Sequence, residues 1–381
     1  MRVLIAPDKF KGSLSAEAVA LAVGNGVRHV RPDVELDLCP VADGGEGTLD
    51  AAISAGFRRI RVLVEGPVGE PVHAAYGERD GVALIELAEA AGLRRLEGAA
   101  LAPLTASTFG TGQLIDAAIR AGNQTIVLAI GGSATTDGGA GIVQALGACL
   151  TDAEGRQLGR GGGALSRVAG LDLTGLQRKL VGRTIVIASD VQNPLLGRGG
   201  AAQVFGPQKG ASASDVQTLE ASLTRWAALV ADATGIDASG RPGAGAAGGV
   251  GFGAMALLGA TMTSGADLVL DMVGFPGRVR QARLVITGEG SLDEQSLAGK
   301  APVRVAAAAA AAGVRTVAVA GRCTVPPDIL SAAGIASAYA LASLEPDLAT
   351  SMAEAGSLLA RLGAQLAAAE LGPAPLSRPP A

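Results

Sequence analysis

The 381-residue chain has few of the side chains on which many enzymes depend. Its two histidines, His29 and His73, lie outside the loops rich in glycine and acidic residues. His29 is expected near the C-terminus of a helix, where a cation is favourable, and His73 in a strand. We therefore do not expect a histidine-based catalytic triad or a histidine-ligated metal.

Other scarcities exclude whole classes of protein. Aromatic residues make up 2% of the chain and the formal net charge is -4, which argues against nucleic-acid binding. The most apolar stretch, 302–321, contains two arginines and a glycine, so it predicts a helix and a strand instead of a membrane span. The apolar start of the chain is too short for a signal peptide. Three isolated cysteines are typical of a reducing cytoplasm.

Glycine, in contrast, is abundant, with 56 residues. A short apolar run is followed repeatedly by a loop rich in glycine or aspartate and then by a helical pattern. This alternation predicts an α/β fold with a mostly parallel sheet. The spacing of Val19, Val23, Val27 and Val30 predicts the apolar face of one such helix, which Ser15 would cap.

Part of the chain departs from this alternation. Residues 60–64, 72–76 and 82–87 form strand-like runs with no helix between them, which predicts antiparallel pairing. The first pattern returns after Val279, so we expect a mixed-sheet α/β domain inserted in a Rossmann- or flavodoxin-like domain. The predicted ranges are 1–70 and 281–371 for the discontinuous parallel-sheet domain, 71–280 for the inserted domain and 372–381 for a disordered tail.

Several loops that follow the apolar runs combine glycine with charged or hydroxyl side chains. In open α/β sheets, ligands bind at the carboxyl ends of the strands, and the next helix offers amides that favour anions. The candidates for binding substrate or phosphate are Asp8, Ser107, Thr108, Gly110, Thr111, Gly131, Gly132, Ser133, Asn193, Lys209, Gly288, Asp293 and Lys300.

The strongest of these loops is IGGSATTDGGAG at 130–141, which joins a buried strand to a helix. Its amides from Gly131 to Ala134 could form an anion-binding nest, and Asp137 could hold Mg²⁺ or orient a hydroxyl. Asp190 follows another buried strand and is a candidate base or metal ligand.

Two familiar nucleotide-binding motifs do not fit. Lys300 follows Gly299, but Ala301 and Glu294 occupy positions where a P-loop needs a hydroxyl residue and a glycine. GAGAAG at 243–248 matches G-x-G-x-x-G, but it follows a turn-like segment where a dinucleotide fold requires a strand. The set of glycine loops, carboxylates and lysines instead suits phosphoryl transfer, which depends on positioning and charge neutralisation.

The same segments resemble the type I glycerate kinase family over about residues 3–344. The shared motifs are IAPDKFKGSLSA, PVADGGEGT, STFGTG, IGGSATTDGGAG, SDVQNPL, VFGPQKG, GAGAAGG and ITGEGSLD, in the family's order. The resemblance implies ATP- and Mg²⁺-dependent phosphorylation of D-glycerate, commonly to 2-phosphoglycerate. It also implies two α/β domains with the active site in the cleft between them. A homodimer is compatible with the sequence, which does not determine the oligomeric state.

The chain differs from the family pattern at a few positions, namely Thr136, Ser189, Gln192, Ser291, Arg322 and Cys323. Gln192 replaces a common aspartate, which weakens a two-carboxylate metal site in that loop. Ser291 replaces a frequent arginine, which removes one phosphate contact.

We expect a glycerate hydroxyl to attack the γ-phosphorus of ATP in line. Asp190 is the first candidate base and Asp137 the second, and Lys9, with Lys300 or Lys209, would neutralise the transferred phosphoryl group. The candidate Mg²⁺ ligands are Asp43, Glu46 and Glu289. Two alternatives stay open, an NAD-dependent oxidoreductase that uses GAGAAG and a non-catalytic two-domain binding protein.

Overall fold

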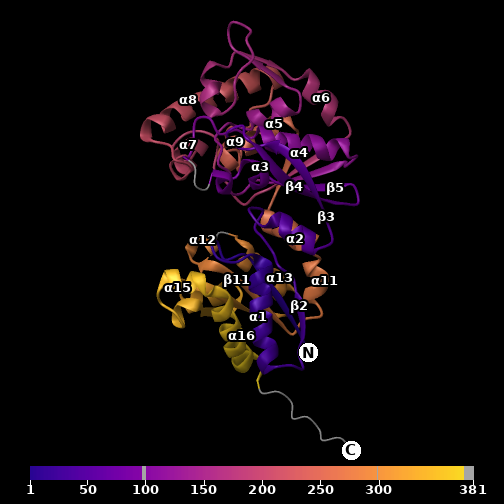
Figure 1. Cartoon of the computed structure of the whole chain (residues 1–381), viewed down its shortest axis with the longest axis vertical. Coiled ribbons are helices and arrows are strands. Elements are labelled where there is room, and N and C mark those ends of the chain that lie inside the picture. Colours follow the sequence, from indigo (N-terminus) through magenta and orange to yellow (C-terminus); the bar gives the residue numbers. More distant parts are fainter. Residues whose placement is uncertain (97–99, 298, 373–381) are drawn as a thin grey trace, which may run out of the picture. The chain divides into compact units, whose positions relative to one another are not determined.

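A computed structural model of the protein describes residues 1–96, 100–297 and 299–372 (Figure 1). The chain divides into two compact units, each with its own large sheet. The first unit comprises Met1–Asp43, Asp50–Ala55 and the chain from Ala266 onward, and the second comprises Gly44–Leu49 and Gly56–Gly265. The predicted architecture, a discontinuous parallel-sheet domain with a mixed-sheet domain inserted, is confirmed.

The first unit is built on a five-stranded sheet in the order β13-β12-β11-β1-β2, in which all neighbours are parallel. Its strands are β1 (Arg2–Pro7), β2 (Glu35–Leu38), β11 (Leu284–Leu292), β12 (Arg315–Cys323) and β13 (Ile335–Ala340). This is the flavodoxin-like order, in which the chain runs outward in opposite directions from β1 and β11. The carboxyl ends of these two strands are therefore the expected place for a ligand.

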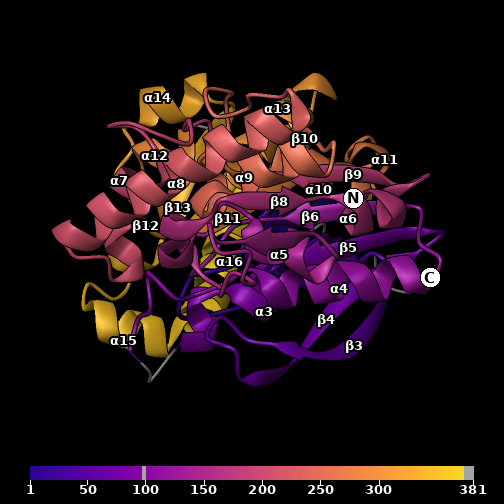
Figure 2. The same ribbon diagram turned by 90° about the horizontal axis from the view of Figure 1, so that it is seen from above.

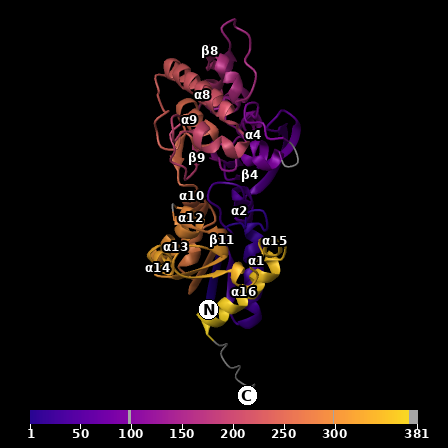
Figure 3. The same ribbon diagram turned by 90° about the vertical axis from the view of Figure 1, so that its left-hand side faces the viewer.

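The helices of this unit cover both faces of its sheet. They are α1 (Ala16–Val30), α10 (Gly265–Met272), α11 (Phe275–Val279), α12 (Glu294–Leu297), α13 (Ala301–Ala311), α14 (Pro327–Ala332), α15 (Leu348–Ala353) and α16 (Ala355–Leu371), with the 3₁₀ turn η4 (Leu341–Ser343). Figures 1 and 3 show the indigo α1 beside the yellow α16, although they come from opposite ends of the chain.

The apolar strands pack on two separate cores. Val3 and Ile5 of β1 face α1 and α16, whereas Leu4 and Ala6 face α10, α11 and α13. Burial on both faces explains why these strands read as continuous apolar runs. In α1, Val19, Val23 and Val27 of the predicted face are buried and Val30 is partly buried. The Ser15 hydroxyl caps the helix by accepting the N–H of Ala18 at 3.2 Å.

The second unit contains a six-stranded mixed sheet in the order β10-β9-β6-β5-β4-β3. These strands are β3 (Arg58–Glu65), β4 (Pro71–Arg79), β5 (Val82–Glu86), β6 (Thr125–Ala129), β9 (Thr184–Ala188) and β10 (Thr261–Thr263). As predicted, the first three pair antiparallel, and the others extend the sheet in parallel. A separate hairpin is formed by β7 (Cys149–Thr151) and β8 (Gly170–Asp172).

The helices of the second unit follow most of its parallel strands. They are α3 (Ala88–Ala91), α4 (Phe109–Arg120), α5 (Ala140–Ala145), α6 (Thr174–Leu180), α7 (Ala201–Phe205), α8 (Ala213–Thr234) and α9 (Ala246–Leu257), with the 3₁₀ turns η1 (Leu93–Leu96), η2 (Gly162–Arg167) and η3 (Pro207–Lys209). Helix α4 packs on β3, β4 and β5 (Figure 2). Helix α2 (Thr48–Ser54) belongs in part to each unit.

The boundaries of the units differ from the expected 1–70, 71–280 and 281–371. Strand β3 joins the second unit because it pairs with β4 over eight positions, from Arg58 to Glu65. Helices α10 and α11 join the first unit because Val269, Leu270 and Phe275 lie in the core under its sheet. The expected tail lies outside the described residues, except for Gly372. No helix in the described ranges is long and apolar enough to span a membrane.

Candidate functional site

In the first unit, acidic side chains lie near β1 and β11, the two strands from which the strand order runs outward in opposite directions. Asp8 follows β1 and is 7% exposed, and its N–H donates to the carbonyl of Gly288 in β11 at 2.7 Å. Burial raises the pKa of Asp8 to about 7, and the nearby carboxylates of Asp43 and Glu289 add to this against the opposing charge of Lys9. Glycine is needed at 288, because a Cβ there would lie 2.1 Å from the carbonyl oxygen of Val319.

Glu289 is the second member of this group, which we call the acidic cluster (Asp8, Asp43 and Glu289). Burial also raises the pKa of Glu289, and the Lys300 ammonium lies 3.6 Å from its Oε2. Its Oε1 is buried and has no hydrogen-bond partner among the described residues. Like charges and an unsatisfied buried oxygen are the features that a bound cation or donor would relieve.

The acidic cluster is not a complete metal site by itself. Within the described ranges, no group of three or more histidine, cysteine, aspartate or glutamate side chains is arranged to hold a metal. Mg²⁺, however, is commonly held by one or two carboxylates together with substrate phosphates and water. Glu46, the third predicted ligand, belongs to the second unit and pairs with Arg94 at 3.3 Å.

Two of the departures from the family pattern contact each other next to this cluster. Ser291 and Arg322 are register partners on neighbouring strands, and Arg322 Nε donates to Ser291 Oγ at 3.1 Å. Ser291 in turn donates to Asp293 Oδ2 at 3.1 Å, while Asp293 Oδ1 accepts the N–H of Gln295. A guanidinium therefore lies at this edge of the sheet even though residue 291 itself carries no charge.

In the second unit, Asp137 is completely buried and surrounded by donors. Its carboxylate accepts the N–H and the hydroxyl of Thr108 at 2.8 and 2.9 Å. It also accepts the N–H groups of Gly139 and Gly141 at 3.2 and 3.3 Å, and the Ser107 hydroxyl at 3.4 Å. Burial raises the pKa of Asp137 against these donors. These contacts join the 107–111 loop to the 130–141 loop, and Asp137 is 0% exposed.

The hydroxyl loop at 107–111, predicted to bind an oxyanion, is used in the same internal network. Ser107, Thr108 and Thr111 are all buried, and the Thr108 hydroxyl also accepts the N–H of Ile142 at 3.1 Å. Gly110 is required for packing, because a Cβ there would lie 1.7 Å from the carbonyl oxygen of Glu65. The 107–111 loop is therefore hydrogen-bonded to Asp137 of the 130–141 loop and to Ile142, which follows it.

Lys209 is another predicted phosphate ligand that the structure buries. Its ammonium donates to Ser133 Oγ at 2.9 Å and to the carbonyl of Thr135 at 2.6 Å, and the residue is 1% exposed. Burial lowers the pKa of Lys209 to about 7, although the charge of Asp137 opposes the shift. Lys209 thus stabilises the turn that carries Ser133.

The remaining predicted site residues of the second unit follow β6 and β9, whose carboxyl ends lie beside that of β5. Glu86, Ala129 and Ala188 are register partners at the ends of β5, β6 and β9. Gly131 lies two residues after Ala129, and the partly exposed Asp190 lies two residues after Ala188, so the two residues follow equivalent positions of neighbouring strands. Gly132 adopts a positive φ of 75° in this turn. Asn193 is held by a bond from its Nδ2 to the carbonyl of Gly199 at 2.8 Å.

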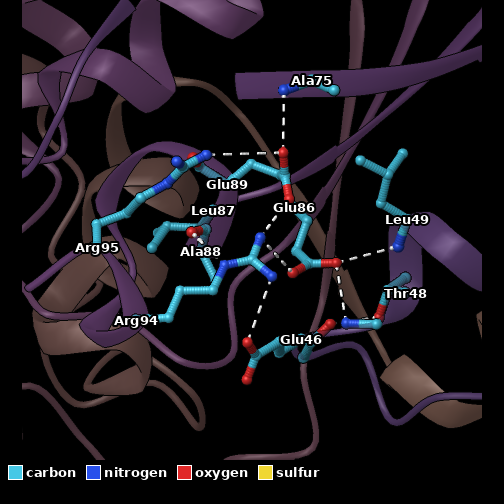
Figure 4. A network of polar contacts seen from close by, with 12 residues as sticks. Glu46, Thr48, Leu49, Ala75, Glu86, Leu87, Ala88, Glu89, Arg94 and Arg95 are labelled. Carbon is cyan, nitrogen blue, oxygen red and sulfur yellow. Dashed lines mark hydrogen bonds and ion pairs between the residues drawn. The ribbon is translucent and has the colours of Figure 1, made fainter. Parts of the chain in front are cut away.

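A polar network beside this edge was not found from the sequence (Figure 4). Glu86 is 1% exposed, and Arg94 lies among Glu46, Glu86 and Glu89. The only signal in the sequence is a lone glutamate at the end of the apolar run VALIE, followed by a pair of arginines.

The GAGAAG segment has the structural role that its context suggests. It follows a turn after α8, and Ala247, Gly248 and Gly249 have positive φ at the start of α9. A Cβ on Gly248 would lie 2.0 Å from the carbonyl oxygen of Thr135. These residues pack against the 130–141 loop, and the strand that a dinucleotide fingerprint requires does not precede them.

Comparison with known proteins agrees with this architecture. The model of the "Glycerate kinase family" matches residues 3–370, and the chain belongs to this family. Glycerate 2-kinase of Escherichia coli (strain K12) is 46% identical over 80% of this chain and 81% of its own length. Glycerate kinase of Halalkalibacterium halodurans is 41% identical over 96% and 97% of the two chains.

A solved structure is similar along nearly the whole chain. It is a crystal structure of a protein assigned as glycerate kinase 2 from Salmonella typhimurium LT2, with a TM-score of 0.82 and 40% sequence identity. The match covers 97% of each chain.

Proposed function

We propose that this protein is an ATP-dependent kinase that phosphorylates D-glycerate, giving 2-phosphoglycerate. Family membership over residues 3–370 supports the substrate class, and the name of the E. coli relative supports position 2 of the product. The observation in the structure that carries the proposal is the acidic cluster, in which Asp8 follows β1 and Glu289 lies in β11, flanked by Lys9 and Lys300. We also propose a cytoplasmic location, which fits the free cysteines among the described residues.

The acidic cluster fits Mg²⁺ bound together with ATP. Its donors are hard carboxylate oxygens, and Glu289 Oε1 is buried without a hydrogen-bond partner among the described residues. One or two carboxylates of the cluster would hold the ion together with ATP phosphates and water, with Asp8 as a candidate ligand in place of the predicted Glu46. When bound, Mg²⁺ neutralises phosphate charge and orients the triphosphate.

Residues of the chain would accept the proton, stabilise the charge of the transferred group and bind the substrates. The glycerate hydroxyl oxygen forms a bond to the γ-phosphorus while the bond to the bridging oxygen of ADP breaks, and Asp190 accepts the hydroxyl proton. Lys9 and Lys300 stabilise the charge on the transferred group. The amides near Gly131 to Ser133 bind an anionic group of a substrate. Asp137, Lys209 and the 107–111 loop keep these amides in position.

A coupled assay of ADP release tests the proposal directly. ATP and Mg²⁺ should give turnover with D-glycerate, and L-glycerate, lactate and glycolate should give much less. Phosphorus NMR of the product should show the phosphate on the C2 oxygen. No ADP release with any hydroxy acid would instead favour the non-catalytic binding protein, and a change in NAD(H) absorbance would favour the oxidoreductase.

A further inference from the structure

Glu86 is a buried carboxylate that does not belong to any of the predicted sites. It ends β5, is 1% exposed, and its Oε2 accepts the N–H groups of Gly47 and Leu49, each at 3.1 Å (Figure 4). A buried carboxylate is costly unless hydrogen bonds and an opposite charge compensate it. Here, the backbone of another segment supplies the hydrogen bonds.

Arg94 supplies the opposite charge. Its Nη2 lies 3.6 Å from Glu86 Oε1, and its Nη1 lies 3.3 Å from Glu46 Oε1. Arg94 also bonds to Glu89, and its Nε donates to the carbonyl of Ala88. Arg94 thus has several partners and connects Glu86 with Glu46. Glu46 lies on the loop whose backbone N–H groups bind Glu86.

That loop, which we call the acidic glycine loop (44–49), lies directly against the candidate anion-binding turn. The carbonyl of Gly44 accepts the N–H of Gly131 at 3.3 Å. A Cβ on Gly131 would lie 2.4 Å from Cα of Gly45, so the two glycine-rich backbones are in contact. A shift of the acidic glycine loop would therefore disturb Gly131 as well.

The same loop contains two of the places where the chain passes between the units. The second unit includes Gly44–Leu49, and the residues on both sides, Asp43 and Asp50, belong to the first. Glu86 binds the amide of Leu49, the last residue before one of these passages. Because Leu49 is the second residue of α2, this hydrogen bond holds the first turn of α2 to Glu86 within the second unit.

We propose that Glu86 is a positioning residue, which holds the acidic glycine loop against Gly131 through the amides of Gly47 and Leu49. The proposal rests on the proposed kinase function for its effect on turnover, but the position of the loop can be measured without it. The position of the loop depends more on the reach of the Glu86 side chain to these two N–H groups than on its charge.

Two substitutions separate reach from charge. Glu86→Gln keeps the length of the side chain and one oxygen acceptor, whereas Glu86→Asp keeps the charge and shortens the reach. We expect Glu86→Asp to lower kcat/KM for glycerate by up to about 100-fold, since a displacement near 1 Å can cost this much. Glu86→Gln should lose less, within about tenfold. A greater loss in Glu86→Gln than in Glu86→Asp would overturn the proposal.

Glu89 offers a matched control in the same network. It also pairs with Arg94 and accepts a backbone N–H, that of Ala75 in β4 at 3.1 Å, but it does not bond to the acidic glycine loop. Glu89→Gln and Glu89→Asp should keep kcat/KM within about twofold of wild type. Equal losses at both glutamates would mean that the network only stabilises the fold, which contradicts the proposal.

Hydrogen–deuterium exchange gives a readout that does not depend on activity. Peptides that cover 44–49 should exchange about tenfold faster in Glu86→Asp than in wild type and be unchanged in the Glu89 variants. Unchanged exchange at 44–49 in folded Glu86→Asp overturns the positioning role. If wild type does not phosphorylate glycerate, the proposed function fails, and the exchange result still decides for or against this inference.

Discussion

Asp8 in the first unit and Asp137 in the second are both buried, and burial raises the pKa of both. They differ in what surrounds them. Asp137 accepts bonds from Thr108, Gly139 and Gly141, so its charge is satisfied inside the protein. Asp8 instead accepts a backbone N–H from Lys9 and lies near the charges of Lys9, Asp43 and Glu289. A buried acid satisfied by many donors holds a structure together, whereas a buried acid that shares its surroundings with other carboxylates is suited to bind a cation.

Asp190 should give the largest effect and extends the comparison to an acid that is partly exposed. Asp190→Asn removes the proposed proton acceptor, and we expect kcat to fall by about a thousandfold. The melting temperature should change little, because a partly exposed carboxylate contributes little to stability. Steady-state kinetics and thermal unfolding check this together, and near-normal turnover would remove Asp190 from this role.

Asp137→Asn should, in contrast to Asp190→Asn, mainly lower the stability of the protein. An amide NH₂ would face the N–H groups of Thr108, Gly139 and Gly141, so the free energy of unfolding should fall by about 3 kcal/mol. Urea unfolding of this variant and of Asp190→Asn, an identical substitution in the same unit, measures the difference. Equal stability of the two variants would show that the donors around Asp137 contribute little.

Asp8→Asn should instead stabilise the protein in the absence of Mg²⁺. The pKa of Asp8 is raised to about 7 from an unfolded value near 3.8, so the folded state binds more protons in between. Wild type therefore loses stability as the pH rises from about 4 to 7, and the part of this loss that falls between pH 5 and 8 is roughly 2–3 kcal/mol. The variant should lack this loss when unfolding is followed with EDTA from pH 5 to 8. A parallel pH profile of the two proteins would contradict the assignment, and activity with Mg²⁺ should fall in the variant.

The sequence alone predicts the fold better than it separates such acids. The parallel sheet, the antiparallel β3–β4 pair and the Ser15 cap all follow from local periodicity and capping chemistry. The short strands β7, β8 and β10 have three residues each, which is too few to show a period.

Other features depend on contacts between distant segments. The donors to Asp137 include Thr108, 29 residues away, and Glu86 binds an amide 37 residues away, at Leu49. No local pattern encodes these pairings, so neither the donors around Asp137 nor the partners of Glu86 can be predicted from the sequence. The boundary near β3 has the same cause, since a strand pattern does not say which sheet the strand joins.

Lys209 provides the smallest and most specific test, because its pH dependence has the opposite direction to that of Asp8. The pKa of Lys209 is lowered to about 7, so between about pH 7 and 10 the unfolded state binds more protons than the folded state. Wild type should therefore gain stability relative to Lys209→Met as the pH rises above 7, by at most about 1.4 kcal/mol per pH unit. Below pH 7, the difference should be constant. Unfolding measured in urea at pH 6, 7, 8 and 9 checks this, with Lys179→Met, a partly exposed lysine of the same unit, as the control. A difference that does not change above pH 7 would mean that the Lys209 ammonium stays charged beside Ser133 and Asp137.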